Sequence, residues 1–215
     1  MFGYEMFLSK NKILPLFRKG LILNPKEEAV NLNRPNIKNE FCFTWRYFFK
    51  KEFLICNDMI FNENIKVAED TIFNMECIFL AKSMYVIDEA LYIYNDANNQ
   101  SIMRRKYKPN YHIDLNKQYL EKKRILKEYN INNKKFLEDY YYYYVYIIIQ
   151  NCIKNICLGK REYIYTDLKN LLNSEMCTDS FRYYNLKRLY KVADNNIFYL
   201  LLVMLKYKIN IAVYA

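Results

Sequence analysis

The stretch MIFNENIKVAEDTIFNMECIFLA, residues 59–81, carries the acidic pair Glu69-Asp70 directly before a helix-like apolar segment. Apolar residues recur on a broad face from Asp70 to Lys82, which predicts a helix with Asp70 at or beside its N-terminus. Carboxylates in a first helical turn are stabilised by the positive end of the helix dipole. Residues 63–68, just before the pair, are expected to form a loop or a short extended piece.

Aromatic and apolar segments lie on both sides of this stretch. WRYFFKKEFL, residues 45–54, precedes it, and MYVIDEALYIYNDANNQSI, residues 84–102, follows it. The second segment is rich in Tyr, Ile and Val, which favours β-structure, and it predicts two short strands, Met84–Asp88 and Ala90–Tyr94. A polar turn should follow at residues 95–100.

The rest of the chain separates into a short mixed region and a long helical one. Residues 3–17 predict a strand, a turn and a second strand, and Asn24 with Pro25 predicts a helix start. Helices are predicted at residues 113–129, 134–158, 161–172, 179–192 and 195–205. We therefore expect an α/β fold, mostly helical and α+β in character, with residues 1–108 as the mixed region and residues 109–215 as the helical one.

Composition bounds the class of protein. The 215 residues are 53% hydrophobic and 18% aromatic, with only 3 Gly and 4 Pro, which favours a globular domain built from long helices. The formal net charge of +10 favours anionic partners, such as nucleotide diphosphates or phospholipid head groups. The same charge also fits the solvated helix faces of a lysine-rich protein, and no nucleic-acid-binding motif is present.

Cysteine and histidine usage argues against a zinc site. Six cysteines occur without a CxxC pair, and there is a single histidine, His112. Most of the cysteines are expected to be small buried hydrophobes, and the absence of a signal peptide pattern indicates a cytoplasmic protein. His112 reads as part of an ordinary helix start, with a capping or surface role.

No stretch is long and apolar enough to predict a membrane span. The best candidate, residues 197–205, is too short and is followed by Lys206 and Lys208. The C-terminal residues 198–215 are basic and aromatic, so they fit either a helix packed on the domain or one lying on an anionic membrane surface. The five consecutive tyrosines at residues 140–144 fit packing or sugar stacking.

Taken alone, the acidic pair leaves two interpretations open. Asp70 can be an ordinary helix N-cap, or it can be a general base. A hydroxyl is a weak nucleophile near neutral pH, so an enzyme that transfers a group to it places a carboxylate where it can accept the proton.

The order of segments from Trp45 to Ser101 resembles the acceptor-side half of a family 2 glycosyltransferase of the inverting GT-A type. The likeness rests on Trp45 with the aromatic-basic run behind it, on Glu69-Asp70 before a helix, and on the Tyr-x-Tyr element that ends at Tyr94. It implies a partial GT-A acceptor-binding region followed by a helical region. Asn95 stands where the family often carries arginine.

The resemblance implies roles for five residues. Asp70 would be the general base, Glu69 its neighbour, and Trp45, Tyr94 and Ser101 would bind the acceptor. The substrates would be a nucleotide sugar and a glycan or lipid-linked acceptor, for cell-envelope polysaccharide, at the inner face of the cell membrane.

The resemblance also implies what the chain would need from elsewhere. Intact family members hold a divalent metal, Mn or Mg, with an Asp-x-Asp motif, and this sequence has no such motif and so no cofactor site of its own. A missing N-terminal half or a partner chain would then bind the donor. Exposed sheet edges and apolar surface should make the chain self-associate. The alternative is an inactive relic that binds glycan, membrane or protein.

Overall fold

The computed structural model describes residues 1–97 and 106–183. The strands are β1 Phe2–Met6, β2 Lys12–Ile13, β3 Gly20–Ile22 and β4 Met84–Tyr94. The helices are α1 Pro25–Asn31, η1 Thr44–Arg46, α2 Lys51–Cys56, α3 Glu69–Leu80, α4 Tyr111–Glu128, α5 Lys134–Ile147, η3 Ile148–Cys152, α6 Ile153–Cys157, α7 Ile164–Asn173 and α8 Glu175–Tyr183. This combination confirms the expected α/β fold with a majority of helix.

The chain forms two compact units. The first contains Met1–Arg105 and Glu121–Leu137, and the second contains Lys106–Leu120 and Glu138–Ala215. Helices α4 and α5 each contribute one end to each unit.

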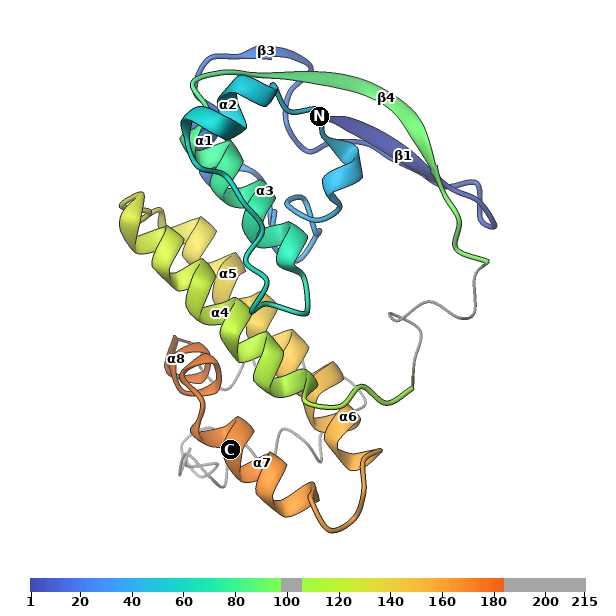
Figure 1. Cartoon of the computed structure of the whole chain (residues 1–215), viewed down its shortest axis with the longest axis vertical. Coiled ribbons are helices and arrows are strands. Elements are labelled where there is room, and N and C mark those ends of the chain that lie inside the picture. The colour runs from blue at the N-terminus through green and yellow to red at the C-terminus, as the bar shows by residue number, and fades with distance from the viewer. Residues whose placement is uncertain (98–105, 184–215) are drawn as a thin grey trace, which may run out of the picture. The chain divides into compact units, whose positions relative to one another are not determined.

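The sheet of the first unit is mixed, with strand order β2-β1-β4-β3. Strand β1 runs parallel to β4 and antiparallel to β2, and β3 runs antiparallel to β4 (Figure 1). The two short strands expected at residues 84–94 are in fact one strand. Pairing shifts from Phe2↔Ile87 to Gly3↔Ala90, so β4 absorbs Asp88 and Glu89 as an irregularity instead of breaking there.

Helix α3 lies along one side of this sheet and carries much of the core of the first unit (Figure 1). It begins at Glu69, close to the expected start, and its apolar face buries Ile72, Met75 and Ile78. Further core contacts come from edge-on and tilted aromatic pairs that Phe79 makes. Burying such side chains is the main favourable term in folding, at roughly 1.5–3 kcal/mol each.

The helix predicted after Asn24 is confirmed. Pro25 is the first residue of α1, and the Asn24 side chain accepts a hydrogen bond from the backbone N–H of Glu27 at 3.2 Å. The strand–turn–strand prediction is also confirmed, because β1 and β2 pair as a hairpin with Tyr4 opposite Ile13.

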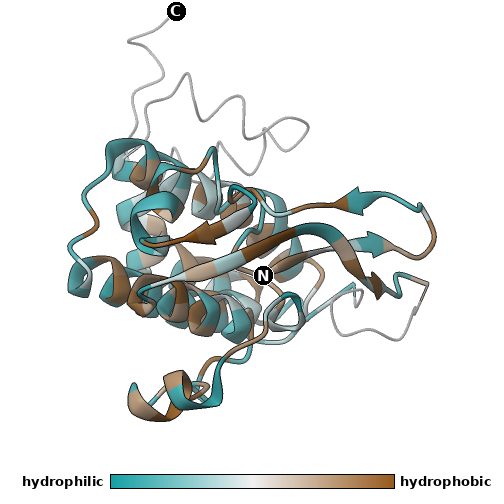
Figure 2. Cartoon of the chain, turned by 90° about the horizontal axis from the view of Figure 1, so that it is seen from above, coloured by the Kyte–Doolittle hydropathy of each residue, from teal (hydrophilic) through white to brown (hydrophobic). Residues whose placement is uncertain are grey.

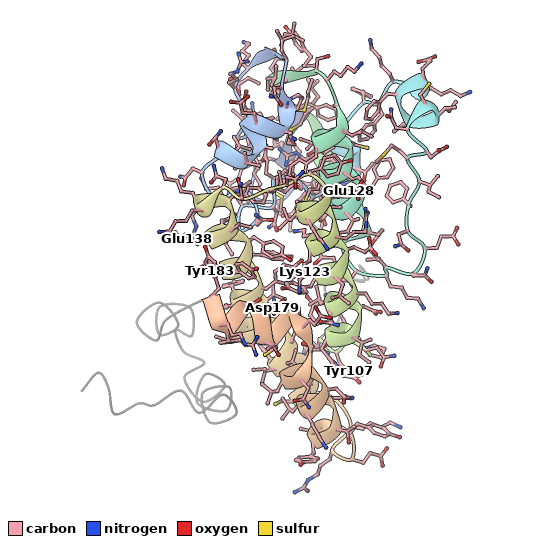
Figure 3. All side chains as sticks on the ribbon, turned by 90° about the vertical axis from the view of Figure 1, so that its left-hand side faces the viewer. Tyr107, Lys123, Glu128, Glu138, Asp179 and Tyr183 are labelled. Carbon is pink, nitrogen blue, oxygen red and sulfur yellow. The ribbon has the colours of Figure 1, made fainter. Side chains whose placement is uncertain are left out.

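In the second unit, tyrosines join the helices. The Tyr119 hydroxyl of α4 donates to the Asp179 carboxylate at 2.7 Å, and the Tyr144 hydroxyl of α5 donates to the Gln118 side chain at 2.6 Å. Asp179 and Tyr183 both lie on α8 (Figure 3), and the Tyr183 ring stacks on Tyr141 at 4.4 Å. Within the tyrosine run, packing is the observed role of the buried Tyr140 and Tyr144.

The helix expected at residues 134–158 is observed as α5, η3 and α6 in direct succession. The segment η3, Ile148–Cys152, is a π-helix, so its backbone hydrogen bonds join residues five apart instead of four. The helices expected at residues 161–172 and 179–192 appear as α7 and α8, and α8 begins four residues earlier than expected. The helix expected at residues 195–205 lies outside the described residues.

Among the described residues, none of the helices is long and apolar enough to cross a membrane. The two segments considered as membrane-spanning or membrane-surface candidates, residues 197–205 and 198–215, lie outside that part of the chain.

Three cysteines are buried as expected, Cys77, Cys152 and Cys177, whereas Cys56 and Cys157 are exposed. Along the strands of the sheet, brown hydrophobic stretches alternate with white and teal ones (Figure 2).

Candidate functional site

The first turn of α3 positions the acidic pair. Ala68, the residue before the helix, adopts a left-handed backbone conformation with φ 56°, and it makes no side-chain cap. Glu69 and Asp70 are therefore the first two residues of the helix, where the dipole favours negative charge. The interpretation of Asp70 as the N-cap is wrong, because Ala68 occupies that position.

The Asp70 carboxylate is held at both oxygens. Its Oδ2 accepts a hydrogen bond from the backbone N–H of Phe43 at 2.7 Å. Its Oδ1 accepts one from the backbone N–H of Thr71 at 2.7 Å, and the Thr71 hydroxyl lies 3.3 Å away. A carboxylate has about four lone-pair positions, so Asp70 keeps the capacity to accept a proton or a further hydrogen bond. The side chain is half-buried, so part of it is accessible to solvent.

Three consecutive residues before η1 make hydrogen bonds to residues of α3. The Asn74 amide donates to the carbonyl of Phe41 at 2.9 Å, and the Cys42 sulfur lies 3.1 Å from the Thr71 hydroxyl. With the bond from Phe43 to Asp70, these contacts fix the loop against the helix. Phe43 is also left-handed, with φ 68°, a conformation that a bulky residue adopts only under constraint.

An aromatic layer extends from this loop to β4. The Trp45 ring stacks on Phe43 at 5.1 Å, on Tyr92 at 4.2 Å and on Tyr94 at 5.8 Å. Tyr4 from β1 packs edge-on against Trp45 at 5.0 Å. Tyr92 is exposed and Trp45, Phe43 and Tyr94 are half-buried, so this layer offers aromatic surface to a ligand.

A buried ion pair lies behind the aromatic layer. The Arg46 guanidinium sits 5.6 Å from the Tyr4 ring centre and 3.6 Å from the Glu40 carboxylate, and its Nε donates to the carbonyl of Phe2. Burial raises the pKa of Glu40, although the Arg46 charge opposes that shift. The Glu40 carboxylate also accepts the backbone N–H of Leu16 at 2.8 Å. This pair therefore anchors the loop that carries Trp45.

The neighbouring thiol is not a nucleophile. Burial raises the pKa of Cys42 to about 11, and the nearby Asp70 charge adds to the increase while the Thr71 hydrogen bond opposes it. The thiolate is the reactive form, so Cys42 is inert near neutral pH.

The structure brings together several of the residues predicted for the site. Trp45 and Tyr94 stack on each other, and Asp70 reaches the same layer through Phe43. Glu69 is exposed and makes no hydrogen bond or ion pair among the described residues. Ser101 lies outside the described residues.

Sequence reasoning missed Phe43 and Tyr92. Tyr92 could have been found from the strand period, because residues two apart on a strand lie on the same face and Tyr94 was already a candidate. Phe43 carried no such signal, since its left-handed conformation is set by tertiary contacts.

No group of three or more His, Cys, Asp or Glu side chains in residues 1–97 and 106–183 is arranged to hold a metal ion. The described residues therefore do not fit the divalent metal that the resemblance implies. His112 is the second residue of α4, but it is buried, so the expected surface role is wrong. Burial lowers the pKa of His112, against the charge of Asp167 at 4.0 Å.

Comparison with curated proteins relates this chain to glycosyltransferases. Over 108 residues, half of this chain, it is 31% identical to the uncharacterized glycosyltransferase EpsJ of Bacillus subtilis (strain 168), and the match covers 31% of that protein. The chain thus spans less than two thirds of its relative's length. No family model and no solved structure matches the chain.

Proposed function

We propose that this chain is the acceptor-binding part of an inverting family 2 glycosyltransferase of the GT-A type. It would help transfer a sugar from a nucleotide-sugar donor to a glycan or lipid-linked acceptor for cell-envelope polysaccharide. The observation that carries the proposal is the half-buried Asp70 carboxylate at the start of α3, held beside an open aromatic layer. The similarity to a glycosyltransferase supports a role in sugar transfer.

In the proposed reaction, Asp70 is the general base. The acceptor hydroxyl donates its proton to the Asp70 carboxylate while its oxygen attacks the anomeric carbon of the donor sugar. The bond from that carbon to the nucleotide diphosphate breaks, and the diphosphate leaves with the electron pair. The hydrogen bonds from Phe43 and Thr71 hold the carboxylate in place, which lowers the entropic cost of reaching the reactive geometry.

The aromatic layer would bind the acceptor sugar. Trp45, Tyr92 and Tyr94 present ring faces and hydroxyl groups, and such surfaces combine apolar contact with hydrogen bonding. Glu69, exposed one residue before the base, would lie at the rim of this site, and Ser101 is proposed as a further acceptor contact.

Donor binding is proposed for a nucleotide-binding unit on the same polypeptide or on a partner chain. That unit would supply the divalent metal, Mn or Mg, which neutralises the leaving diphosphate. We place the protein in the cytoplasm, at the inner face of the cell membrane.

A second candidate function is a non-catalytic interaction module. The observation that favours it is that both Asp70 oxygens already accept hydrogen bonds from the chain itself, which gives Asp70 a structural role without catalysis. In that case, replacing Asp70 would change stability but no sugar transfer.

The first prediction separates these two functions. The Asp70→Asn substitution is introduced into the chromosomal gene of the organism that encodes this protein. Incorporation of sugar into glycan is then measured in lysates that contain equal amounts of the wild-type or variant protein. Loss of a general base lowers rates by about 100-fold or more, and we expect that loss here. Glu69→Gln should reduce transfer by less than about tenfold, because Glu69 does not take the proton.

Thr71→Val is the matched control for folding. It removes the hydroxyl beside Asp70 and Cys42 but keeps the carboxylate, so transfer should persist even if the melting temperature falls. Wild-type transfer by Asp70→Asn would overturn the catalytic proposal and leave the interaction module.

A further inference from the structure

We propose that a second pocket, beside the middle of α3, binds an uncharged, hydroxyl-rich segment of the acceptor glycan. The inference rests on the proposed function, and it assigns to the pocket the part of the acceptor that does not react. The pocket lies wholly within the first unit and does not include Asp70 or the aromatic layer.

The pocket has a volume of about 700 Å³, within the roughly 300–1,000 Å³ typical of small-molecule sites. Its walls are the loop at residues 57–64, one side of α3 and the α4 residues Glu121 and Arg124. Two parallel rings line it, because Phe61 stacks on Phe73 with centres 4.2 Å apart and planes 7° apart. Amide and carboxylate side chains of the loop supply the polar lining.

Arg124 is held rigidly at the pocket wall by three carboxylates. Its Nε donates to Glu121 at 2.8 Å, its Nη1 to Glu128 at 2.6 Å and its Nη2 to Glu76 at 3.0 Å. Burial alone would lower the pKa of Arg124, but the hydrogen bonds that Arg124 donates to Glu121 and Glu76 outweigh this effect and raise the pKa. A guanidinium has five N–H donors, so this clamp leaves donor capacity as well as fixed carboxylate oxygens.

The charge of the lining selects against anions. The pocket lining contains one cation, Arg124, and four carboxylates, those of Asp58, Glu63, Glu76 and Glu121. The lining therefore has a net charge of −3. The chain as a whole carries +10, so the pocket is an acidic exception on a basic protein. A nucleotide diphosphate would be repelled here, which separates this pocket from the donor site.

Groups in the loop lack partners. The side chains of Asp58 and Glu63 are exposed and make no hydrogen bond or ion pair with the described residues, and Ile60 has 82% of its surface exposed. Carboxylates that accept hydrogen bonds, set beside exposed apolar and aromatic surface, match a sugar ring, whose hydroxyls donate and whose C–H face is apolar.

Helix α3 connects the pocket to the candidate base. Phe73 lies three residues after Asp70, and residues three apart are neighbours on a helix surface. The rise between them is about 4.5 Å, so sugar units of one glycan chain can contact both places. Binding energy from the distant units can then position the reacting hydroxyl at Asp70.

The test measures binding, not transfer. A panel of short neutral oligosaccharides is titrated into the full chain by calorimetry, for the wild type and for Asp58→Asn/Glu63→Gln. Both changes keep side-chain size, and Asn tolerates the left-handed φ of 49° at Asp58. We expect affinity to fall by about tenfold or more, the effect of losing one or two hydrogen bonds to ligand.

Glu52→Gln/Glu89→Gln is the matched control. It removes the same two negative charges from exposed positions of the first unit outside the pocket, and it should leave affinity unchanged. Equal weakening by both double variants, or no binding by any oligosaccharide, would overturn the proposal. So would a pocket that binds a lysine-rich peptide and no glycan.

The outcome is separable from that of the catalytic proposal. If Asp70→Asn leaves transfer intact while the pocket variants still weaken glycan binding, catalysis by Asp70 fails and the glycan subsite stands. If Asp70→Asn abolishes transfer while the pocket variants bind normally, the subsite alone fails.

Discussion

Among the residues that the structure describes, Arg46 is the bulkiest side chain that is almost completely buried, with 1% of its surface exposed. Its charge is compensated by Glu40, by the Phe2 carbonyl and by the Tyr4 ring face. Removing one partner of a buried pair leaves the other charge without compensation, which costs more than the pair itself contributes.

We therefore predict that Arg46→Met lowers the free energy of unfolding by about 3–5 kcal/mol near neutral pH, measured by urea denaturation. Arg46 opposes the raised pKa of Glu40, so its removal raises that pKa further. A carboxyl group with a raised folded-state pKa contributes stability below its unfolded pKa and loses it as pH rises through the folded pKa. The cost of Arg46→Met should thus shrink between about pH 7 and about pH 5.

Arg18→Met is the control for this experiment. Arg18 pairs with Glu28 at 2.8 Å but is largely exposed, so its loss should cost no more than about 1 kcal/mol. A similar cost for both variants, or a cost for Arg46→Met that does not depend on pH, would contradict the assigned role of Arg46.

Among single residues, the sequence predicted Asp70, Trp45 and Tyr94, and the structure places them around one loop. The sequence did not predict that Arg46 and Glu40 are buried, because a charged residue among polar and aromatic neighbours is normally exposed to solvent. Only the three-dimensional packing of Tyr4 and Phe2 makes that burial tolerable.

At the scale of elements, strand β1 depends on the absence of a side chain at Gly3. A Cβ there would lie 2.6 Å from the Ile13 carbonyl oxygen and 3.2 Å from that of Glu89. Strand β1 lies between β2 and β4, and these oxygens belong to the two flanking segments. The close approach coincides with the irregular pairing of β1 with β4, whose register shifts on both sides of Gly3.

Gly3→Ala should therefore destabilise the protein by about 1–3 kcal/mol, as overpacking of a well-packed site does. Gly20→Ala is the comparison, because no atom lies within 4 Å of its added Cβ and only its φ of 95° opposes a side chain. Its cost should be about 1 kcal/mol. Thermal unfolding of both variants checks the prediction, and an unchanged Gly3→Ala would show that the strands can move apart.

The elements themselves were largely predictable. Periodicity located α3, α4 and the α5–α6 succession, and capping chemistry located α1. The break expected at Glu89 was wrong, because β4 pairs in parallel with β1 on both sides of that residue, and β1 is more than eighty residues away in sequence. Local pattern cannot detect pairing at such separation.

At the scale of the whole molecule, several large apolar side chains of the sheet are exposed. Leu21 and Tyr85 are directly opposite each other on β3 and β4, with 55% and 62% of their surfaces exposed, and Ile93 is 64% exposed. Exposed apolar surface next to an edge strand favours association between chains.

We predict that Leu21→Thr/Tyr85→Thr/Ile93→Thr reduces self-association in gel filtration and light scattering without loss of fold. Threonine keeps the strand preference while removing apolar surface. The control, Leu158→Thr/Tyr163→Thr/Tyr165→Thr, changes equally exposed residues of the second unit and should still associate. A wild-type chain that stays monomeric at high concentration would contradict the prediction.

The single tryptophan of the chain gives the aromatic layer an optical consequence. Trp45 stacks on Tyr92 and Tyr94, so its emission reports on the candidate acceptor site and on no other part of the protein. A ligand that covers the ring would shift or quench this fluorescence. Unfolding of the first unit would separate Trp45 from these rings, so the same emission would report that transition without labelling or substitution.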